Sequence, residues 1–552
     1  MSTHNATVPL SRPDSSKTIG EQDGYTKDPN APLTPNTLEG QAAADGATSE
    51  LPQGRQLGVI SATFLIVNRI VGTGVFATTS TILAQSGSTG MSLIYWAIGA
   101  VIAVTGYLVY AEFASAIPRN GGELNYLQHI YKKPRFLVAS MYAAQALLLG
   151  QAAGNAYTAG RYLMRAGGQS NEWGSRGIGV LVLVAALIVH GTMLKWGLRF
   201  QNVVGLFKLV ILVLIAFTGF AALAGKSRAN PPPDNFTNAF EGTRSDLYGI
   251  VSCIYNAVWS YVGYSNIFYA LGEIRTPVRT IKIAGPLALG VITVLYMLVQ
   301  VAYFAAVPRD QILGGSQIVA SLFFQNMFGE SSARALSVFV ALSATANVFS
   351  VIFSQGRLNQ ALGRDGIVPF SKILASNRPF KSPLAGLTWH VIVTLVILLA
   401  PPAGDAYDFV LNLSSYPLNV VNAAVALGLL SAYLPHRLRP QWAKTWSPSI
   451  RASLPVVLFF TLISLFLVIA PWIAPSKPEE AVYKSLWYAI APAVSVAFFV
   501  AGATYWLVWF VLLPRVGRYT LVPVQTKLKD GTPVTVFVKE TAGHGVRTGG
   551  EL

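Results

Sequence analysis

The sequence predicts an all-α polytopic membrane protein with twelve transmembrane helices, built as a 5+5 inverted repeat with broken first and sixth spans. Three observations support this fold class. Of the 552 residues, 52% are hydrophobic and only 12% are charged, whereas soluble proteins carry about 25% charged residues. Apolar stretches of 18 or more residues recur from Leu57 to Leu513, and such stretches can cross a hydrocarbon core about 30 Å thick. Glycines interrupt two of the stretches near mid-span.

The composition excludes several classes of protein. A mean hydropathy of +0.48 rules out a soluble enzyme and a disordered scaffold. The single cysteine, Cys253, allows no intramolecular disulfide. The net charge of +16 raises the question of nucleic acid, but the chain has no basic run that would track a phosphate backbone. The cations lie between apolar spans, so we expect a lipid bilayer and no nucleic acid as partner.

Three regions follow one another along the chain. Residues 1–54 are polar and have no apolar run, which predicts a disordered cytoplasmic tail. Residues 55–513 form the transmembrane domain, and residues 514–552 are a polar C-terminal tail, also expected in the cytoplasm. In chain order, the predicted spans are 57–84, 91–117, 136–160, 177–194, 201–224, 247–272, 283–307, 333–361, 384–400, 407–434, 453–473 and 486–513.

The distribution of cations predicts the orientation. With the N-terminus inside, the cytoplasmic segments hold 28 of the 40 Lys and Arg residues and the outer loops hold 10, while Arg69 and Lys208 lie within spans. This bias and the even number of spans place both termini in the cytosol. The triplet Asn235-Phe236-Thr237 then lies in an outer loop, where Asn235 is a candidate for glycosylation.

The two interrupted spans carry the strongest functional signal. The first reads Ile70-Val71-Gly72-Thr73-Gly74, and the sixth reads Trp259-Ser260-Tyr261-Val262-Gly263-Tyr264. Glycine weakens a helix, and backbone groups released at membrane depth need partners. Paired interruptions in corresponding positions of two halves point to a transporter site, although a lone motif of this kind more often marks close helix packing.

Such a site suits an amino acid. Released N–H groups at the start of a half-helix attract a carboxylate, and released carbonyls accept hydrogen bonds from an ammonium group. A zwitterion therefore needs no charged side chain there. The eighth span is the least apolar of the twelve, and its polar face is expected to look inward; that face comprises Ser343, Thr345, Asn347, Ser350, Ser354 and Gln355.

These motifs resemble those of the L-type branch of the amino acid–polyamine–organocation superfamily, and within it the fungal high-affinity methionine permeases. The resemblance covers nearly all of residues 55–515. Further segments that carry it are Tyr110–Phe113, Ile117–Glu123, Ser354–Arg357, Gly363–Gly366 and Ala400–Tyr407.

The resemblance implies roles for individual residues. Backbone N–H groups of Thr73 and Gly74 would bind the carboxylate, and carbonyls of Ile70, Trp259 and Val262 would bind the ammonium. Trp259 would also close over the substrate as a gate, although a packed interfacial aromatic is the plainer alternative. The substrate-binding set predicted from both breaks is Ile70, Gly72, Thr73, Gly74, Trp259, Val262 and Gly263.

Lys208 is the candidate coupling residue. A lysine at membrane depth is costly unless it has a partner, and we expect carbonyls of the unwound first span to supply one. Similar transporters hold a lysine where sodium-coupled relatives bind sodium, which implies sodium independence, with the proton as coupling ion. The alternative is a static strut.

Other ionisable residues give weaker predictions. Arg69, one turn before the first break, is either an inward-facing tie between helices or a substrate-binding residue. Glu112 and Glu273 lie near predicted cytoplasmic span ends and are candidates for an ion-paired gate, although solvated helix-end pairs would look the same.

An enzyme is not expected, because no catalytic motif, metal-ligand spacing or cofactor site is present. The broken spans predict secondary active uptake of a neutral amino acid. The resemblance implies that methionine is the first substrate and that the protein lies in the plasma membrane. The pocket for the substrate side chain is expected to be lined by apolar and small polar groups such as Val262, Tyr264, Ala346 and Asn347. No Asp or Glu lies at their depth to pair with a cationic side chain. A broad-specificity exchanger and a transporter-like nutrient receptor remain alternatives.

Overall fold

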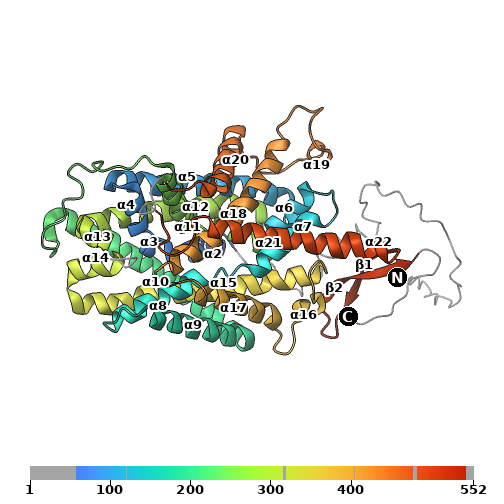
Figure 1. Ribbon diagram of the computed structural model, residues 1–552, viewed down its shortest axis with the longest axis horizontal. Coiled ribbons are helices and arrows are strands. Elements are labelled where there is room, and N and C mark those ends of the chain that lie inside the picture. The colour runs from blue at the N-terminus through green and yellow to red at the C-terminus, as the bar shows by residue number, and fades with distance from the viewer. Residues whose placement is uncertain (1–57, 120, 315–318, 403, 476–480, 542–552) are drawn as a thin grey trace, which may run out of the picture. The chain divides into compact units, whose positions relative to one another are not determined.

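Helices supply nearly all of the regular structure in the computed structural model, which describes residues 58–119, 121–314, 319–402, 404–475 and 481–541 (Figure 1). All of these residues belong to one compact unit of the chain, residues 51–552. The predicted N-terminal tail, residues 1–54, lies outside the described residues.

The first five predicted spans run from α2 to η1. Their elements and the connecting helix α6 are α2 Val59–Ile70, α3 Gly74–Ala77, α4 Thr79–Ser86, α5 Thr89–Ala116, α6 Glu123–Ile130, α7 Leu137–Leu148, α8 Ala153–Ala166, α9 Glu172–Thr192, α10 Leu194–Ala221 and η1 Ala222–Lys226.

The remaining seven predicted spans run from α11 to α22, and a hairpin follows them. The elements are α11 Leu247–Ser260, η2 Tyr264–Glu273, α12 Pro277–Ala306, α13 Arg309–Gly314, α14 Val319–Phe328, α15 Glu330–Arg364, α16 Ser371–Ala375, α17 Leu384–Leu399, α18 Ala406–Ser431, α19 Gln441–Lys444, α20 Leu454–Ile469, η3 Ala470–Trp472, α21 Ile490–Trp506, η5 Leu507–Leu512, α22 Leu513–Val516, β1 Tyr519–Lys527 and β2 Pro533–Thr541.

The described helices account for the twelve predicted spans. Ten of them are long and apolar enough to cross a membrane. The sixth span is divided into α11 and η2, and the ninth is α17, which has 16 residues. The first and sixth spans are both broken, five spans apart in chain order, as the sequence predicts. The fold is that of a twelve-helix membrane protein.

A third interruption was not predicted. The third span divides into α7 and α8, with Leu149–Ala152 between them. A Cβ on Gly150 would lie 2.9 Å from the Cα of Thr394 in α17, so only a glycine lets these two spans approach so closely. The polar residue Gln151 thereby comes to lie at a helix break inside the bundle.

The surfaces of the helices separate a lipid-facing side from a buried one. On α10, Val203, Leu206, Val210 and Phe217 are 71%, 58%, 55% and 70% exposed, and their spacing of three, four and seven residues places them on one face of the helix. Lys208 lies on the opposite side of the same helix and is buried. The predicted polar face of α15 points inward, because Ser343, Asn347, Ser350 and Gln355 are all buried.

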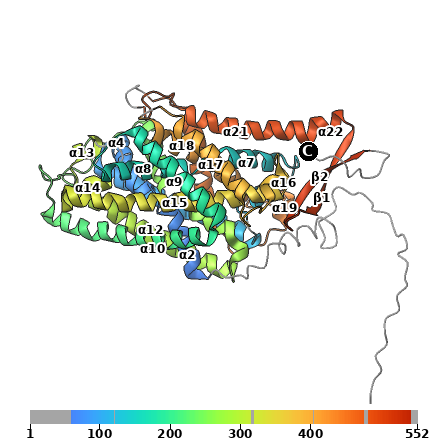
Figure 2. The same ribbon diagram turned by 90° about the horizontal axis from the view of Figure 1, so that it is seen from below.

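The last span runs beside α7. Figure 2 shows α21, η5 and α22 as one long rod along α7. A Cβ on Gly502 would lie 2.6 Å from the Cα of Met141, so the small residue permits this close contact. The rings of Phe136 and Phe510 extend the contact, with centroids 5.1 Å apart.

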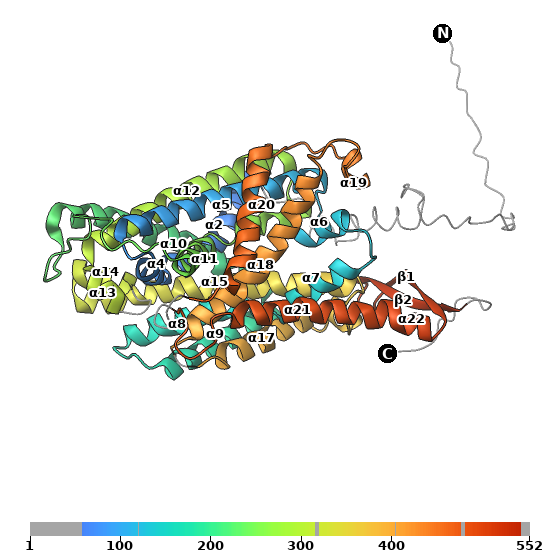
Figure 3. The ribbon, with the colours of Figure 1, turned by 45° about the horizontal axis from the view of Figure 1, so that its top comes forward.

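The segment after residue 513, expected as a polar tail, contains an antiparallel hairpin of β1 and β2 (Figure 3). Its turn lies against the loop after α16, where the carboxylate of Asp530 accepts hydrogen bonds from the backbone N–H of Asn377 at 2.8 Å and the hydroxyl of Ser376 at 3.1 Å. The alternating Val and Thr residues of 533–538 are the strand signal in the sequence.

Candidate functional site

The first break lies between α2, which ends at Ile70, and α3, which begins at Gly74. Within the break, the N–H of Gly72 donates to the carbonyl of Ile70 at 2.7 Å. The N–H groups of Thr73 and Gly74 stand at the start of α3, where a helix offers no carbonyl partner. Both residues are buried. A ligand that accepts hydrogen bonds from these N–H groups would therefore bind inside the protein.

The second break separates α11 from the 3₁₀ helix η2 at Tyr261–Gly263. Gly263 has φ +130°, a backbone conformation that other residues rarely adopt. A Cβ there would also lie 2.5 Å from Cγ of Arg69. The glycine is therefore required both by the turn and by the close approach of the first span.

The two breaks are in direct contact. A Cβ on Gly74 would lie 2.6 Å from the Cα of Ser260. The hydroxyls of Thr78 and Ser260 are 3.1 Å apart, and each also donates to a carbonyl of its own helix. Thr78 and Ser260, which are 182 positions apart in the chain, thus form a polar contact inside the bundle.

Lys208 holds the end of α2. Its Nζ donates to the carbonyl of Val71 at 2.8 Å and to that of Asn68 at 3.3 Å. These are the carbonyls that the break leaves without helical partners, and they are the kind of partner expected from the sequence. Gly205, one turn earlier on α10, permits the approach, because a Cβ there would lie 2.0 Å from the side-chain oxygen of Asn68.

Two of the three expected ammonium acceptors already have donors. The carbonyl of Ile70 accepts from Tyr296 Oη at 3.0 Å as well as from Gly72. The carbonyl of Trp259 accepts from the N–H of Val262 at 3.1 Å. An incoming ammonium group would therefore exchange with these donors. Tyr296 was not singled out from the sequence, because an aromatic residue in an apolar span looks like any other core side chain.

Trp259 lies next to aromatic residues of two other spans. It packs against a buried cluster that includes Tyr157 of α8 and Tyr407 of α18, whose ring centroids are 6.4 Å apart. Tyr157 also lines a cavity of about 500 Å³. This cavity is at the end of the bundle that the charge distribution predicts to face outward. Trp259 at the second break and Tyr157 at the cavity are thus connected through one packed cluster.

The cavity of about 500 Å³ has a charged lining and the volume of a ligand pocket. Arg161 lines it one turn after Tyr157 on α8, and Asp408, the residue that follows Tyr407 on α18, lines it as well. The charged residues along its wall are Arg161, Arg165, Glu172, Asp408 and Lys484. Both signs of charge are present, which suits a zwitterion approaching from water.

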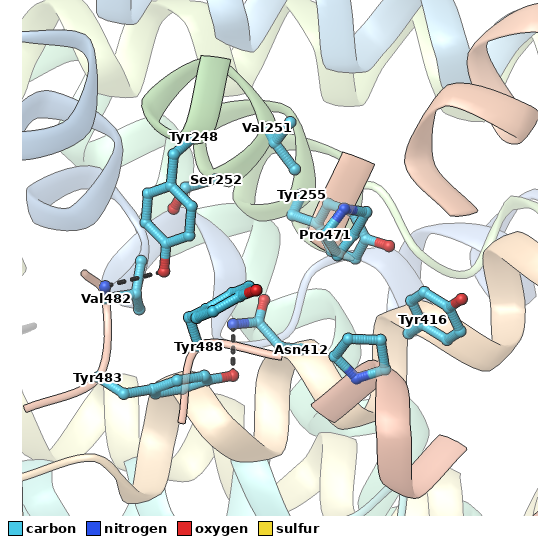
Figure 4. A pocket seen from close by; sticks show the side chains of 11 residues that line it. Tyr248, Val251, Ser252, Tyr255, Asn412, Tyr416, Pro471, Val482, Tyr483 and Tyr488 are labelled. Carbon is cyan, nitrogen blue, oxygen red and sulfur yellow. Dashed lines mark hydrogen bonds between the residues drawn. The ribbon is translucent and has the colours of Figure 1, made fainter. Parts of the chain in front are cut away.

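A second cavity lies between α11, α18 and the segment around Tyr483 (Figure 4). Its volume of about 40 Å³ is far below the ~300–1,000 Å³ of ligand pockets. Its tyrosines bond to the protein itself: the N–H of Val482 donates to Tyr248 Oη at 3.0 Å, and Asn412 Nδ2 donates to Tyr483 Oη at 2.8 Å. This cavity is a packing gap rather than a substrate site.

The two glutamates predicted for the cytoplasmic gate, Glu112 and Glu273, lie outside the breaks at 71–73 and 261–263. Glu112 is buried near the end of α5 and accepts from the N–H of Ala452 at 2.8 Å, Trp446 Nε1 at 3.0 Å and Tyr433 Oη at 3.3 Å. These described partners are neutral and belong to the segment between α18 and α20. The side chain of Glu273 is outside the described residues. A gating role for both residues stays a prediction.

Asn235, the predicted glycosylation site, uses its side chain in the protein. Its Nδ2 donates to the carbonyls of Phe304 and Val307, both at 2.7 Å, and its Oδ1 accepts from the N–H of Arg309 at 3.1 Å. Attachment of a glycan would replace one of the two hydrogens on Nδ2, so at least one of these two hydrogen bonds would be lost.

Comparisons with known proteins give a consistent result. The sequence profile of a family described as amino acid permease matches residues 57–499. The chain is 48% identical to the high-affinity methionine permease of Saccharomyces cerevisiae over 88% of this chain and 84% of the relative. It is 31% identical to the low-affinity methionine permease of the same yeast over 92% of each chain. It is 27% identical to the human b(0,+)-type amino acid transporter 1, over 77% of this chain and 83% of the relative.

Proposed function

The chain belongs to the amino acid permease family, and we propose that it takes up neutral amino acids by secondary active transport, with methionine as the preferred substrate. The observation that carries the proposal is the contact between two broken spans, which brings backbone N–H groups of the first break close to the backbone of the second at the centre of the bundle. The choice of methionine rests on the two yeast relatives, which are methionine permeases.

In the proposed mechanism, backbone groups of the two breaks bind the α-amino and α-carboxyl groups of the substrate. The N–H groups of Thr73 and Gly74 bind the carboxylate, favoured by the positive end of the following helix. The carbonyls of Ile70, Trp259 and Val262 bind the ammonium, which takes the place of Tyr296 Oη at Ile70. Because these contacts use only the backbone and the zwitterion, they serve any neutral amino acid.

Access to the site alternates between the two sides of the membrane. The substrate arrives through the cavity of about 500 Å³, which is wide enough for an amino acid. Trp259 then moves with its cluster to close the path above the bound substrate. Glu112 and Glu273 act near the cytoplasmic ends of the second and sixth spans, where the path to the cytoplasm opens.

Coupling is assigned to Lys208 and the proton. A charged Lys208 ties α10 to the free carbonyls of Asn68 and Val71, and loss of its proton would weaken both hydrogen bonds and free the first span to move. The same ammonium group takes the carbonyls that a bound sodium ion would need. Transport is therefore sodium-independent in this proposal.

The proposed location is the plasma membrane, with both termini in the cytoplasm. The orientation can be tested with single introduced cysteines, because the native Cys253 is the chain's only cysteine and is buried. An impermeant maleimide added to intact cells should label Thr237→Cys and leave Lys444→Cys unlabelled. The reverse pattern would contradict the orientation.

Uptake into proteoliposomes tests the function itself. Labelled methionine should accumulate when an inward proton gradient is imposed, and unlabelled methionine should compete better than leucine or arginine. Equal competition by leucine or arginine would favour a broad-specificity permease. Protonophore-resistant uptake that is stimulated by internal amino acid would indicate an exchanger. Binding without any uptake would indicate a nutrient receptor.

A further inference from the structure

Arg69 connects the first break to two other spans. Its Nη1 donates to Asn347 Oδ1 of α15 at 3.1 Å, and its Nη2 donates to Gln151 Oε1, in the interruption of the third span, at 3.2 Å. Asn347 returns the contact, because its Nδ2 donates to the backbone carbonyl of Arg69 at 3.1 Å. The arginine thus has a fixed position rather than a free, snorkelling one.

The side chain of Arg69 crosses the site between the two breaks. Its stem passes over Gly263 of the sixth span, where an added Cβ would lie 2.5 Å from Cγ of Arg69. Its guanidinium then reaches Asn347, which is itself 2.5 Å from the Cβ position of Gly72. The charge therefore lies on the side of the breaks that faces α8 and α15, beyond the backbone groups proposed to bind the α-amino and α-carboxyl groups.

No carboxylate among the described residues is paired with the positive charge of Arg69. Both side-chain acceptors are neutral amides, and the ion pairs found among the described residues do not include Arg69. Lys208 is close enough for the two positive charges to interact. A third cation brought to this depth would meet repulsion from both groups, and a low dielectric would strengthen that repulsion.

We propose that Arg69 is the specificity-determining residue that excludes cationic amino acids, with Asn347 and Gln151 holding its guanidinium against the substrate side-chain pocket. This inference rests on the proposed uptake of neutral amino acids and assigns their selection by charge to one side chain. An amino acid with an uncharged side chain reaches the pocket without penalty, and the amide partners accept hydrogen bonds without neutralising the arginine.

Lysine and norleucine form a matched pair of probes, because lysine is norleucine with an ammonium group on its terminal carbon. Each is used to inhibit labelled methionine uptake in proteoliposomes with the membrane potential clamped at zero, and the ratio of the two inhibition constants is the readout. For the wild type, we expect norleucine to inhibit on the order of 10- to 100-fold more strongly than lysine.

Two pairs of variants separate charge from structure. Arg69→Met removes the charge and should reduce the lysine-to-norleucine ratio at least tenfold, whereas Arg69→Lys keeps the charge and should keep the ratio. Asn347→Asp places a carboxylate on the intact guanidinium and should also reduce the ratio, whereas Asn347→Ser should not. A merely structural role for Arg69 would change both inhibition constants together and leave the ratio unaltered.

The outcomes distinguish this inference from the proposed function. Wild-type methionine uptake with an unchanged ratio in Arg69→Met overturns the role of Arg69 alone. If Arg69→Met no longer binds norleucine, the two Asn347 variants decide. A lysine-to-norleucine ratio that is the same in Asn347→Asp as in Asn347→Ser then overturns the role of Arg69. A wild-type protein that takes up no methionine overturns the proposed function and this inference with it.

Discussion

The Nζ of Lys208 lies 2.8 Å from the carbonyl oxygen of Val71, and this contact joins the fifth span to the broken end of the first. The carbonyl has no helical partner, and the lysine is buried with no described carboxylate paired to it. Each group therefore satisfies the other. The contact explains how a lysine is tolerated at membrane depth, where an unpaired one would be costly.

Replacing Lys208 by Met should reduce methionine uptake roughly tenfold or more, because two buried carbonyls lose their donor. The remaining uptake should no longer respond to a proton gradient.

In the wild type, replacing sodium by choline should leave methionine uptake unchanged, and a protonophore should abolish accumulation of methionine. A strict sodium requirement, or a Lys208→Met protein that still follows the proton gradient, would contradict the coupling role.

Gly74→Val should abolish uptake while the protein still reaches the membrane. A Cβ at this position lies 2.6 Å from the Cα of Ser260, which is backbone and cannot turn aside, and the added bulk covers the carboxylate donors. Gly74→Ala should already lose most of the activity for the same reason.

Gly290→Ala in α12 is the matched control, because a Cβ there meets nothing within 4 Å. Surface expression and uptake of this variant should equal those of the wild type. Normal transport by a well-expressed Gly74→Val protein would remove the basis of the backbone site.

Tyr296→Phe should lower the KM for methionine by roughly fivefold, because a hydrogen bond of about 1 kcal/mol to the Ile70 carbonyl no longer competes with the substrate ammonium. Tyr303→Phe on the same helix, whose hydroxyl makes no hydrogen bond with the described residues, is the control and should leave the KM unchanged. An unaltered or raised KM in Tyr296→Phe would show that the ammonium binds elsewhere.

The C-terminal hairpin should detach from the α16 loop in acid. Although partial burial of Asp530 acts in the opposite direction, hydrogen bonds from the backbone N–H groups of Asn377 and Thr532 lower its pKa to about 2. A lowered pKa means that the ionised form favours the docked hairpin. This stabilisation is complete above the ordinary pKa of 3.8 and is lost as the pH falls towards 2.

Hydrogen exchange of residues 519–541, corrected for the intrinsic effect of pH, measures this docking. Asp530→Asn should exchange faster than the wild type at pH 7, and the difference should shrink between pH 4 and pH 2. Equal protection in both proteins at pH 7 would show that Asp530 does not hold the hairpin.

Local sequence features alone were enough for the class of protein, the positions of the spans and the breaks in the first and sixth spans. An apolar run of about 20 residues has few alternatives to a membrane helix. A glycine pair at mid-span weakens that helix wherever the helix packs. Even the partner of Lys208 could be expected. The carbonyls at a broken helix lack hydrogen-bond donors, and a buried ammonium group needs acceptors.

Only the tertiary structure decided which side chains meet across the bundle. Tyr296 was found at the Ile70 carbonyl, and Arg69 was found between Gln151 and Asn347, the second of which is 278 positions away in the chain. In the sequence, Arg69 could be a helix tie or a substrate-binding residue with equal reason. Such contacts depend on the rotation and depth of each helix relative to its neighbours. These are set by the summed packing of all spans, so no local pattern around one residue contains them.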